Sequence, residues 1–177
     1  LPRREEVGVF ASPDEFRGDL QRDDHLADVA VIADGQGPQA VLPETLPPRS
    51  AEQPHSALQG ARWPEARSEV AAVLHPALPA SPGHALWTRD YAGAASLFGV
   101  VMKGGDEAAA HALMSALQLF GLGYSWGGFE SLITHETGQL AFRERPSRLP
   151  GELLRLHVGL EDPADLIADL EAGLAAW

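Results

Sequence analysis

One arginine of this chain stands where it could bind an anion. It is Arg155, in the segment "LLRLHVGLE", whose apolar residues alternate along the chain. The alternating residues are Leu154, Leu156, Val158 and Leu160. This pattern predicts a β-strand with one buried face. A guanidinium binds a carboxylate through two parallel hydrogen bonds, so an inward-facing arginine on an apolar strand indicates a carboxylate partner. The residues allow two such partners, the carboxylate of a ligand or a structural ion pair with Glu130 or Glu161.

The segment "GLGYSWGGFES", Gly121 to Ser131, is unusually rich in glycine and aromatic residues. Glycines let a backbone approach a ligand closely, and exposed N–H groups in such a loop can bind a carboxylate. A purely structural interpretation is equally compatible with the residues. In that case Gly121 ends a helix, the chain bends into an edge strand, and Tyr124, Trp126 and Phe129 anchor the segment in the core.

Other reactive side chains give weaker patterns. Lys103 is the only lysine, and it precedes Gly104 and Gly105 after an apolar run, which is typical of a solvated surface charge. Schiff-base chemistry needs an amine whose pKa is lowered by burial or by neighbouring cations. The seven histidines show no H-x-x-x-H or H-E-x-x-H spacing, so we expect no metal site. No G-x-S-x-G motif is present, which argues against a serine hydrolase.

Composition narrows the class of protein further. The formal net charge is −12, with 13 basic residues among 25 acidic ones, and this balance argues against binding nucleic acid. The chain has no cysteine, which excludes disulfides and thiolate metal sites. No apolar run reaches the roughly 18 residues of a membrane span. We therefore expect no membrane association and a cytoplasmic location.

The chain divides into two parts of different character. Residues 1–69 hold eight of the 14 prolines and form a poorly specified segment. Residues 50–69 have helix-forming composition, but Pro64 should break or kink a helix there, because proline lacks a backbone donor. We accordingly expect much of residues 30–65 to be loosely packed. Residues 70–177 are expected to form one ordered unit, a C-terminal substrate-recognition domain.

The second part shows clear signals of an α/β fold. Apolar strands are predicted near residues 70–78 and 96–104. Asp106 is expected to cap a helix that runs to Phe120 and stops at Gly121. Asp162 is expected to cap the last helix, which carries an apolar stripe. The sequence thus predicts a small, mostly antiparallel sheet covered by helices.

Three ordered blocks of this second part resemble one known family. They are "VLHPALPASPGHALWTRDYAGAASLFGVV", "ALQLFGLGYSWGGFESLI" and "LLRLHVGLEDPADLIADLEAGLAA". Together they closely resemble the C-terminal part of the cystathionine β-lyases, in the cysteine and methionine metabolism family of pyridoxal-phosphate enzymes. The resemblance is dense from about residue 69 to the last residue, whereas residues 7–50 match the family weakly and look degraded.

The resemblance implies a C-terminal domain of a fold-type-I pyridoxal-phosphate enzyme. It further implies a fragment of a carbon–sulfur lyase of transsulfuration and methionine biosynthesis, which acts on a sulfur-containing amino acid and belongs to a homo-oligomeric family. By this likeness Arg155 binds the substrate α-carboxylate, Ser125 contacts the same group, and Tyr124 and Trp126 form the cavity wall. No catalytic residue and no metal ligand is assigned.

Pyridoxal phosphate is the cofactor of the intact family, but Lys103 does not match the family's cofactor lysine. We therefore expect this chain alone not to bind the cofactor and to be inactive. The alternative function, from another class, is a non-catalytic binding or subunit-interaction module, or a decayed remnant of the enzyme.

Overall fold

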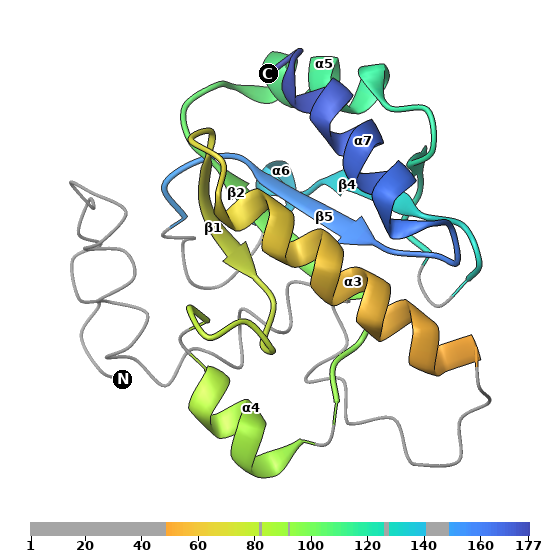
Figure 1. Ribbon diagram of the computed structural model, residues 1–177. Coiled ribbons are helices and arrows are strands. Elements are labelled where there is room, and N and C mark those ends of the chain that lie inside the picture. Colours follow the sequence, from red (N-terminus) through yellow and green to blue (C-terminus); the bar gives the residue numbers. More distant parts are fainter. Residues whose placement is uncertain (1–48, 82, 92, 126–127, 141–148) are drawn as a thin grey trace, which may run out of the picture.

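Five strands form one sheet in the part of the chain that the computed structural model describes, which is residues 49–177 without 82, 92, 126–127 and 141–148 (Figure 1). In spatial order they are β1 (Val70–Leu74), β2 (Leu97–Met102), β5 (Leu153–His157), β4 (Leu132–His135) and β3 (Gly121–Leu122). All neighbouring pairs are antiparallel except β3 and β4, which run parallel. The predicted small, mostly antiparallel sheet is confirmed.

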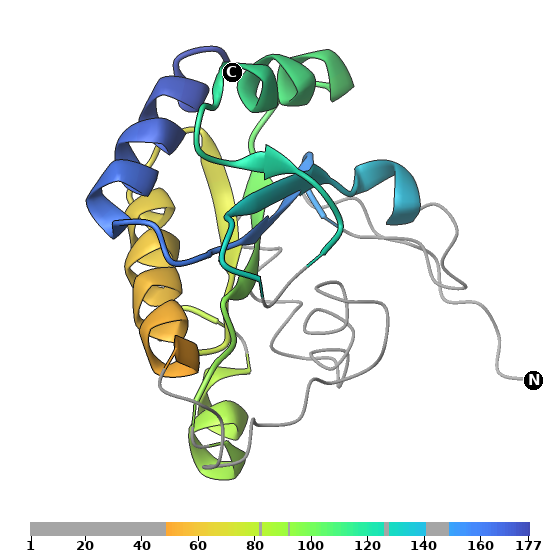
Figure 2. The same ribbon diagram turned by 90° about the vertical axis from the view of Figure 1, so that its right-hand side faces the viewer.

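Helices cover one face of this sheet. The described helices are α3 (Arg49–Glu65), α4 (His84–Asp90), α5 (Glu107–Ala116), α6 (Thr137–Leu140) and α7 (Pro163–Leu174). α7 contacts both α3 and α5, and α3 lies against β1 and β2, so these three helices form a layer (Figures 1 and 2). Between this layer and the sheet lies the main apolar core, which includes Phe98, Leu156 and Leu170.

The opposite face of the sheet carries a second, smaller apolar cluster. It contains Ala71, Ala72 and Val101 from the strands, together with Leu140 of α6 and Leu153 of β5. Every residue of β5 is buried, so the prediction that this strand has one buried face is wrong. Its alternating Leu154 and Leu156 mark the face toward the helices. On the other face Leu153 packs in the smaller cluster, and the two polar residues of the strand contact the backbone carbonyls of residues 124 and 128. The fold as a whole is the expected α/β domain.

Helix α3 overturns part of the prediction for the first part of the chain. It runs without interruption past both Pro54 and Pro64. The helix ends one residue after Pro64, so the backbone donor missing at Pro64 weakens only the last turn. Its Ala57 and Ala61 are fully buried in the main core. The expectation of loose packing is therefore wrong for residues 49–65. Residues before 49 lie outside the described part, and the boundary between residues 69 and 70 stays a prediction.

The two predicted aspartate caps are confirmed. Asp106 accepts a hydrogen bond from the backbone N–H of Ala109 at the start of α5. Asp162 accepts one from Ala164 at the start of α7, where Pro163 occupies the first turn. Such caps satisfy N–H groups that have no partner within the helix.

Helix α5 ends four residues earlier than predicted, at Ala116 instead of Phe120. The cause is Asp169, a buried residue of α7. Its carboxylate accepts backbone hydrogen bonds from Gln118 at 2.7 Å, Leu119 at 2.8 Å and Phe120 at 3.2 Å. An ionised acceptor strengthens each of these bonds, so the backbone leaves the helix and turns toward α7.

Replacing Asp169 by alanine should lower the free energy of unfolding by about 2–4 kcal/mol, because three backbone donors would lose a buried acceptor. Asp165→Ala is the matched control, since Asp165 is an exposed aspartate in the first turn of the same helix. It should cost less than about 1 kcal/mol, the usual size of an exposed charge's interaction with the helix dipole. Urea unfolding followed by tryptophan fluorescence measures both variants. Equal midpoints for the two variants would show that the Asp169 carboxylate does not hold residues 118–120.

Candidate site for a carboxylate

Arg155 lies at the centre of the sheet. On β5 it pairs with Gly99 of β2 on one side and with Thr134 of β4 on the other. Its side chain belongs to the face opposite the layer of α3 and α7, because Leu154 and Leu156 on either side of it point into the main core. Arg155 is buried, with 7% of its surface exposed. The space above Gly99 is filled by the side chains of Leu74 and Leu153, which pack beside this part of the sheet.

The guanidinium of Arg155 reaches the glycine-rich segment. Its Nη1 and Nη2 both donate to the carbonyl oxygen of Tyr124, each at 3.2 Å. The next residue along the chain is Ser125, which is exposed. The structure therefore brings Arg155 to the backbone beside Ser125. The proposed joint contact of the two side chains with one carboxylate stays a prediction, and Trp126 lies outside the described residues.

The ion-pair alternative for Arg155 named Glu161, and this carboxylate is bound elsewhere. It accepts hydrogen bonds from the backbone N–H and the hydroxyl of Ser131, each at 2.8 Å. The Ser131 hydroxyl oxygen in turn accepts a bond from the N–H of Gly159, also at 2.8 Å. These bonds fasten the end of the glycine-rich segment to the residues between β5 and α7.

The aromatic residues of the segment do not anchor it in the core. Tyr124 is 63% exposed and Phe129 is 70% exposed, so the structural interpretation is wrong for these two residues. Tyr124 instead accepts a hydrogen bond on its hydroxyl from Nε2 of Gln139 at 3.0 Å. The segment begins with β3, whose pairing with β4 brings Gly121 against Leu132. A Cβ at Gly121 would lie 3.3 Å from the Leu132 side chain, so the two residues pack closely.

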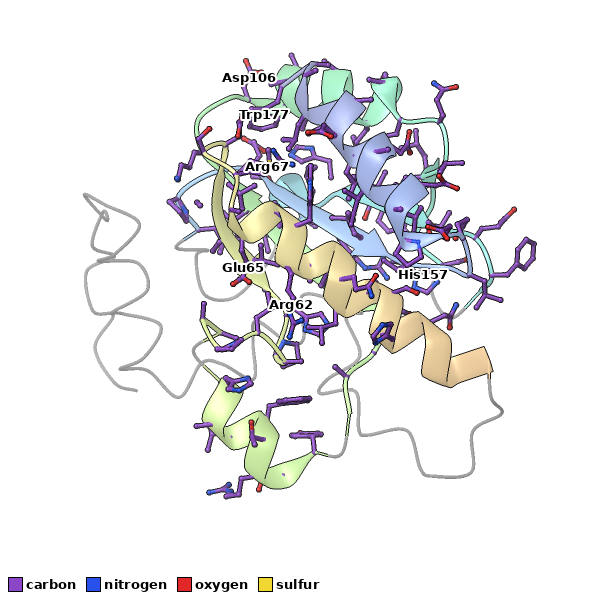
Figure 3. All side chains as sticks on the ribbon, viewed as in Figure 1. Arg62, Glu65, Arg67, Asp106, His157 and Trp177 are labelled. Atoms are coloured by element: carbon purple, nitrogen blue, oxygen red, sulfur yellow. The ribbon has the colours of Figure 1, made fainter. Side chains whose placement is uncertain are left out.

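His157 contacts the segment from the end of β5, where Figure 3 shows its side chain. It lies two residues after Arg155 and therefore on the same face of the strand. Its Nε2 donates to the carbonyl of Gly128 at 3.4 Å, and its Nδ1 is bonded to the Ser96 hydroxyl at 3.0 Å. Burial lowers the pKa of His157, and the positive charge of Arg155 lowers it further. A neutral His157 adds no second positive charge beside the guanidinium. Gln53 of α3 also donates to the Gly128 carbonyl, at 2.5 Å.

An open cavity of about 630 Å³ lies next to this segment. Tyr124 and Thr134 line it, as do Glu107 and His111 of α5 and His135 of β4. The spacing of histidines along the sequence gave no sign of this grouping, because its two histidines come from a helix and a strand. A search for motifs within one element misses such a cluster.

Lys103 lies at the surface, as the sequence predicted. It follows β2, is exposed, and donates from Nζ to the carbonyl oxygen of Ser68 at 3.1 Å. Gly104 and Gly105 after it have φ values of 62° and 69°, a left-handed turn that favours glycine. The one lysine of the chain thus occupies an exposed turn at the end of a strand.

Comparison with known proteins defines the class. Residues 43–175 match the model of the Cys/Met metabolism PLP-dependent enzymes, and the chain belongs to this family.

Among its relatives is a putative cystathionine beta-lyase of Rhizobium johnstonii, which is 51% identical over 126 residues, or 68% of this chain and 31% of that protein. A cystathionine beta-lyase of Bordetella avium is 47% identical over 131 residues, or 73% of this chain and 33% of that protein. The resemblance to cystathionine β-lyases is thus confirmed.

A solved structure supports the fold. Cystathionine gamma synthase of Xanthomonas oryzae pv. oryzae, in complex with aminoacrylate and cysteine, superposes with a TM-score of 0.64 at 33% identity. The match covers 72% of this chain and 34% of that one. The chain therefore spans about a third of the length of these relatives, and its fold is that of a domain of a fold-type-I enzyme. Among the described residues, no helix is long and apolar enough to cross a membrane.

Ser131→Ala should loosen the glycine-rich segment, because it removes the hydroxyl that joins Glu161 to the N–H of Gly159. We expect faster amide hydrogen exchange across residues 121–131 and a loss of about 1–2 kcal/mol in the free energy of unfolding. Ser115→Ala, at an exposed position of α5, is the control and should leave both unchanged. Unaltered exchange in Ser131→Ala would contradict this role.

Proposed function

We propose that this chain forms the substrate-carboxylate side of the active site of a pyridoxal-phosphate-dependent carbon–sulfur lyase of the cystathionine β-lyase type. In this proposal Arg155 binds the α-carboxylate of a sulfur-containing amino acid, and Ser125 adds a hydrogen bond to the same group. Tyr124 and Trp126 form the adjoining wall. The observation that carries the proposal is the buried guanidinium of Arg155, directed at the glycine-rich segment.

The guanidinium of Arg155 has the shape and charge that match a carboxylate. Both terminal nitrogens of the buried guanidinium donate to the backbone carbonyl of Tyr124, so the charged group is held beside the glycine-rich segment. A carboxylate meets such a fork with two charge-assisted bonds and also neutralises it. Ser125 is exposed and follows Tyr124 in the chain. A ligand arriving from solvent at Ser125 would therefore also be close to the guanidinium of Arg155.

The chain is similar both to lyases and to a synthase, which catalyse different reactions. This similarity fits a role of the region in binding the substrate rather than in choosing the bond that breaks. A cystathionine beta-lyase and a cystathionine gamma synthase share this region with the chain. Holding a carboxylate orients the substrate without deciding which bond breaks. In the intact family, pyridoxal phosphate acts as the electron sink for loss of the α-proton and elimination of the thiol. The exposed position of Lys103 supports the further proposal that this chain alone does not hold the cofactor.

A second candidate function is a non-catalytic module for subunit interaction, or a remnant of the enzyme that keeps such a surface. Three large apolar side chains favour it: Leu122 is 73% exposed, Tyr124 63% and Phe129 70%. Exposed apolar groups that gather on one segment are typical of surfaces that contact another polypeptide. Homo-oligomerisation, as in the family, and a cytoplasmic location belong to the proposal in either case.

The carboxylate site is tested by titrating the ¹⁵N-labelled chain with L-cystathionine. We expect shifts of the backbone amides of Gly123 and Ser125 in the wild type. Arg155→Gln should weaken binding at least tenfold, because a charge-assisted pair is worth roughly 1.5–3 kcal/mol. Arg89→Gln is the control, since Arg89 is exposed and pairs with Asp90 away from the sheet.

Ser125→Ala provides a second variant that leaves the buried arginine in place, and we expect it to weaken binding several-fold. Dispersed amide spectra establish that each variant is folded. Saturable binding that is equal in the wild type, Arg155→Gln and Ser125→Ala would refute the assignment, as would the absence of binding to the wild type.

The cofactor part of the proposal has its own experiment. After the chain is mixed with pyridoxal phosphate and dialysed, we expect no stoichiometric visible absorption band and no thiol release from cystathionine. Lys103→Ala should behave like the wild type, because its exposed amine has an ordinary surface environment. A stoichiometric band that disappears in Lys103→Ala, together with turnover, would make the chain a complete small lyase.

A further inference from the structure

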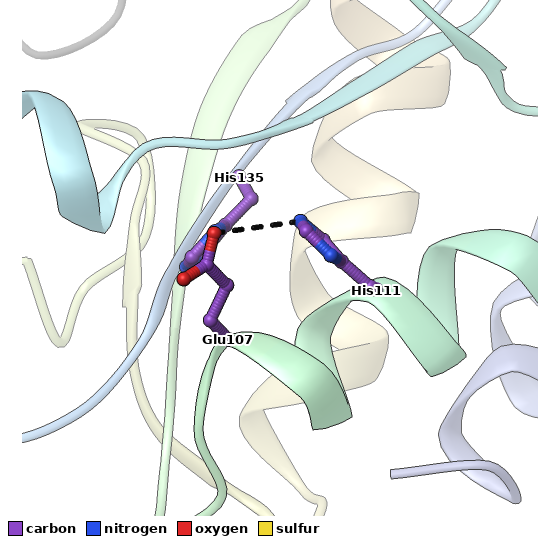
Figure 4. A group of neighbouring side chains, drawn as sticks. All are labelled: Glu107, His111 and His135. Carbon is purple, nitrogen blue, oxygen red and sulfur yellow. Dashed lines mark ion pairs between the residues drawn. The ribbon is translucent and has the colours of Figure 1, made fainter.

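We propose that Glu107, His111 and His135 form a binding site for one divalent transition-metal ion, with Zn²⁺ as the reference ion. Each residue offers one ligand atom, and these atoms all lie within 4.8 Å of one another (Figure 4). Glu107 and His111 stand one turn apart on α5, with Oε1 and Nε2 3.9 Å apart. His135 is the last residue of β4 and faces them from the sheet.

The donor set suits a borderline metal ion. Two imidazoles and one carboxylate are a ligand combination that zinc uses when one coordination position stays open. Tetrahedral coordination at Zn–N distances of about 2.0–2.1 Å needs ligand atoms roughly 3.4 Å apart. Glu107 and His111 have side chains that are 76% and 58% exposed, so both can rotate to close the remaining distance. Only side-chain torsions need to change.

The contact between Glu152 and His135 supports a role of His135 as a metal ligand. Glu152 binds Nε2 of His135 through its carboxylate, and both side chains are largely buried, with 19% and 11% exposure. A carboxylate that holds a histidine ring is the usual outer contact of a metal-ligating histidine, because it fixes the tautomer and orientation of the ring. His135 is also in edge contact with the ring of His111, at 5.9 Å between centroids.

The surroundings leave space for a further ligand. All four residues, Glu107, His111, His135 and Glu152, line the 630 Å³ cavity. A water molecule or a donor atom of a small molecule can therefore complete the coordination. The bound ion would join the first turns of α5 to the end of β4 across this cavity. This site contains neither Arg155 nor Ser125, so it does not depend on the proposed carboxylate function.

Calorimetric titration of the tag-free chain with ZnCl₂ tests the site. We expect one equivalent bound with a dissociation constant in the micromolar range or below, and no binding of Mg²⁺, which prefers oxygen ligands. His111→Ala and His135→Ala should each weaken binding at least tenfold. His55→Ala is the matched control, because His55 is an exposed histidine on α3 and lies outside the cluster.

Co²⁺ provides a readout of geometry that does not depend on stability. We expect the absorption bands of tetrahedral Co²⁺ in the wild type and in His55→Ala, and their loss in His111→Ala, whose exposed side chain can be removed without opening the core. Glu152→Gln should keep the stoichiometry and weaken affinity by about tenfold or more. The proposal is overturned if the wild type binds no zinc, or if His111→Ala binds it as well as His55→Ala does.

Discussion

The carboxylate of Asp169 fixes the path of the chain between α5 and the sheet. It accepts three consecutive backbone donors after the helix, from a position about fifty residues further along the sequence. This contact stops α5 at Ala116, so the following residues turn in time for Gly121 to pair beside Leu132. The position of β3 determines where the glycine-rich segment starts, and hence where the Tyr124 carbonyl meets Arg155. A single interaction from α7 thus sets the geometry on the far edge of the sheet.

Local signals in the sequence predicted the elements well where neighbouring residues decide the outcome. Asp106 and Asp162 cap helices through bonds that span two or three residues, so their positions could be read directly. The end of α5 could not, because it depends on Asp169 in a later helix. The sequence also could not show that both faces of β5 are buried. Alternating apolar residues identify one buried face, but they carry no information on what covers the other face. The prediction that Pro64 breaks the helix was wrong for a related reason. A proline destabilises a helix little in the last turn, and α3 is stabilised by the packing of one face against the core.

The residues of the candidate sites divide in the same way, into those that the sequence predicted and those that only the tertiary fold could reveal. Arg155 stood out as a guanidinium within an apolar strand, and the family resemblance supplied its partner segment. Gly99 and Thr134, which flank it in the sheet, could be identified only once the strand register was known. The grouping of Glu107, His111 and His135 also required the tertiary fold, because a helix and a strand supply its members. Side chains brought together by pairing or packing escape any test that uses spacing along the chain.

The two-residue strand β3 has a consequence for the behaviour of the protein in solution. A sheet edge offers unpaired backbone groups on which another chain can add a strand, and long flat edges invite aggregation. β3 pairs with Leu132 and Ile133, the first two residues of β4, and ends after Leu122. The edge it leaves is too short to act as a template for strand addition. The same glycine-rich segment that meets Arg155 therefore also limits strand addition at this edge of the sheet.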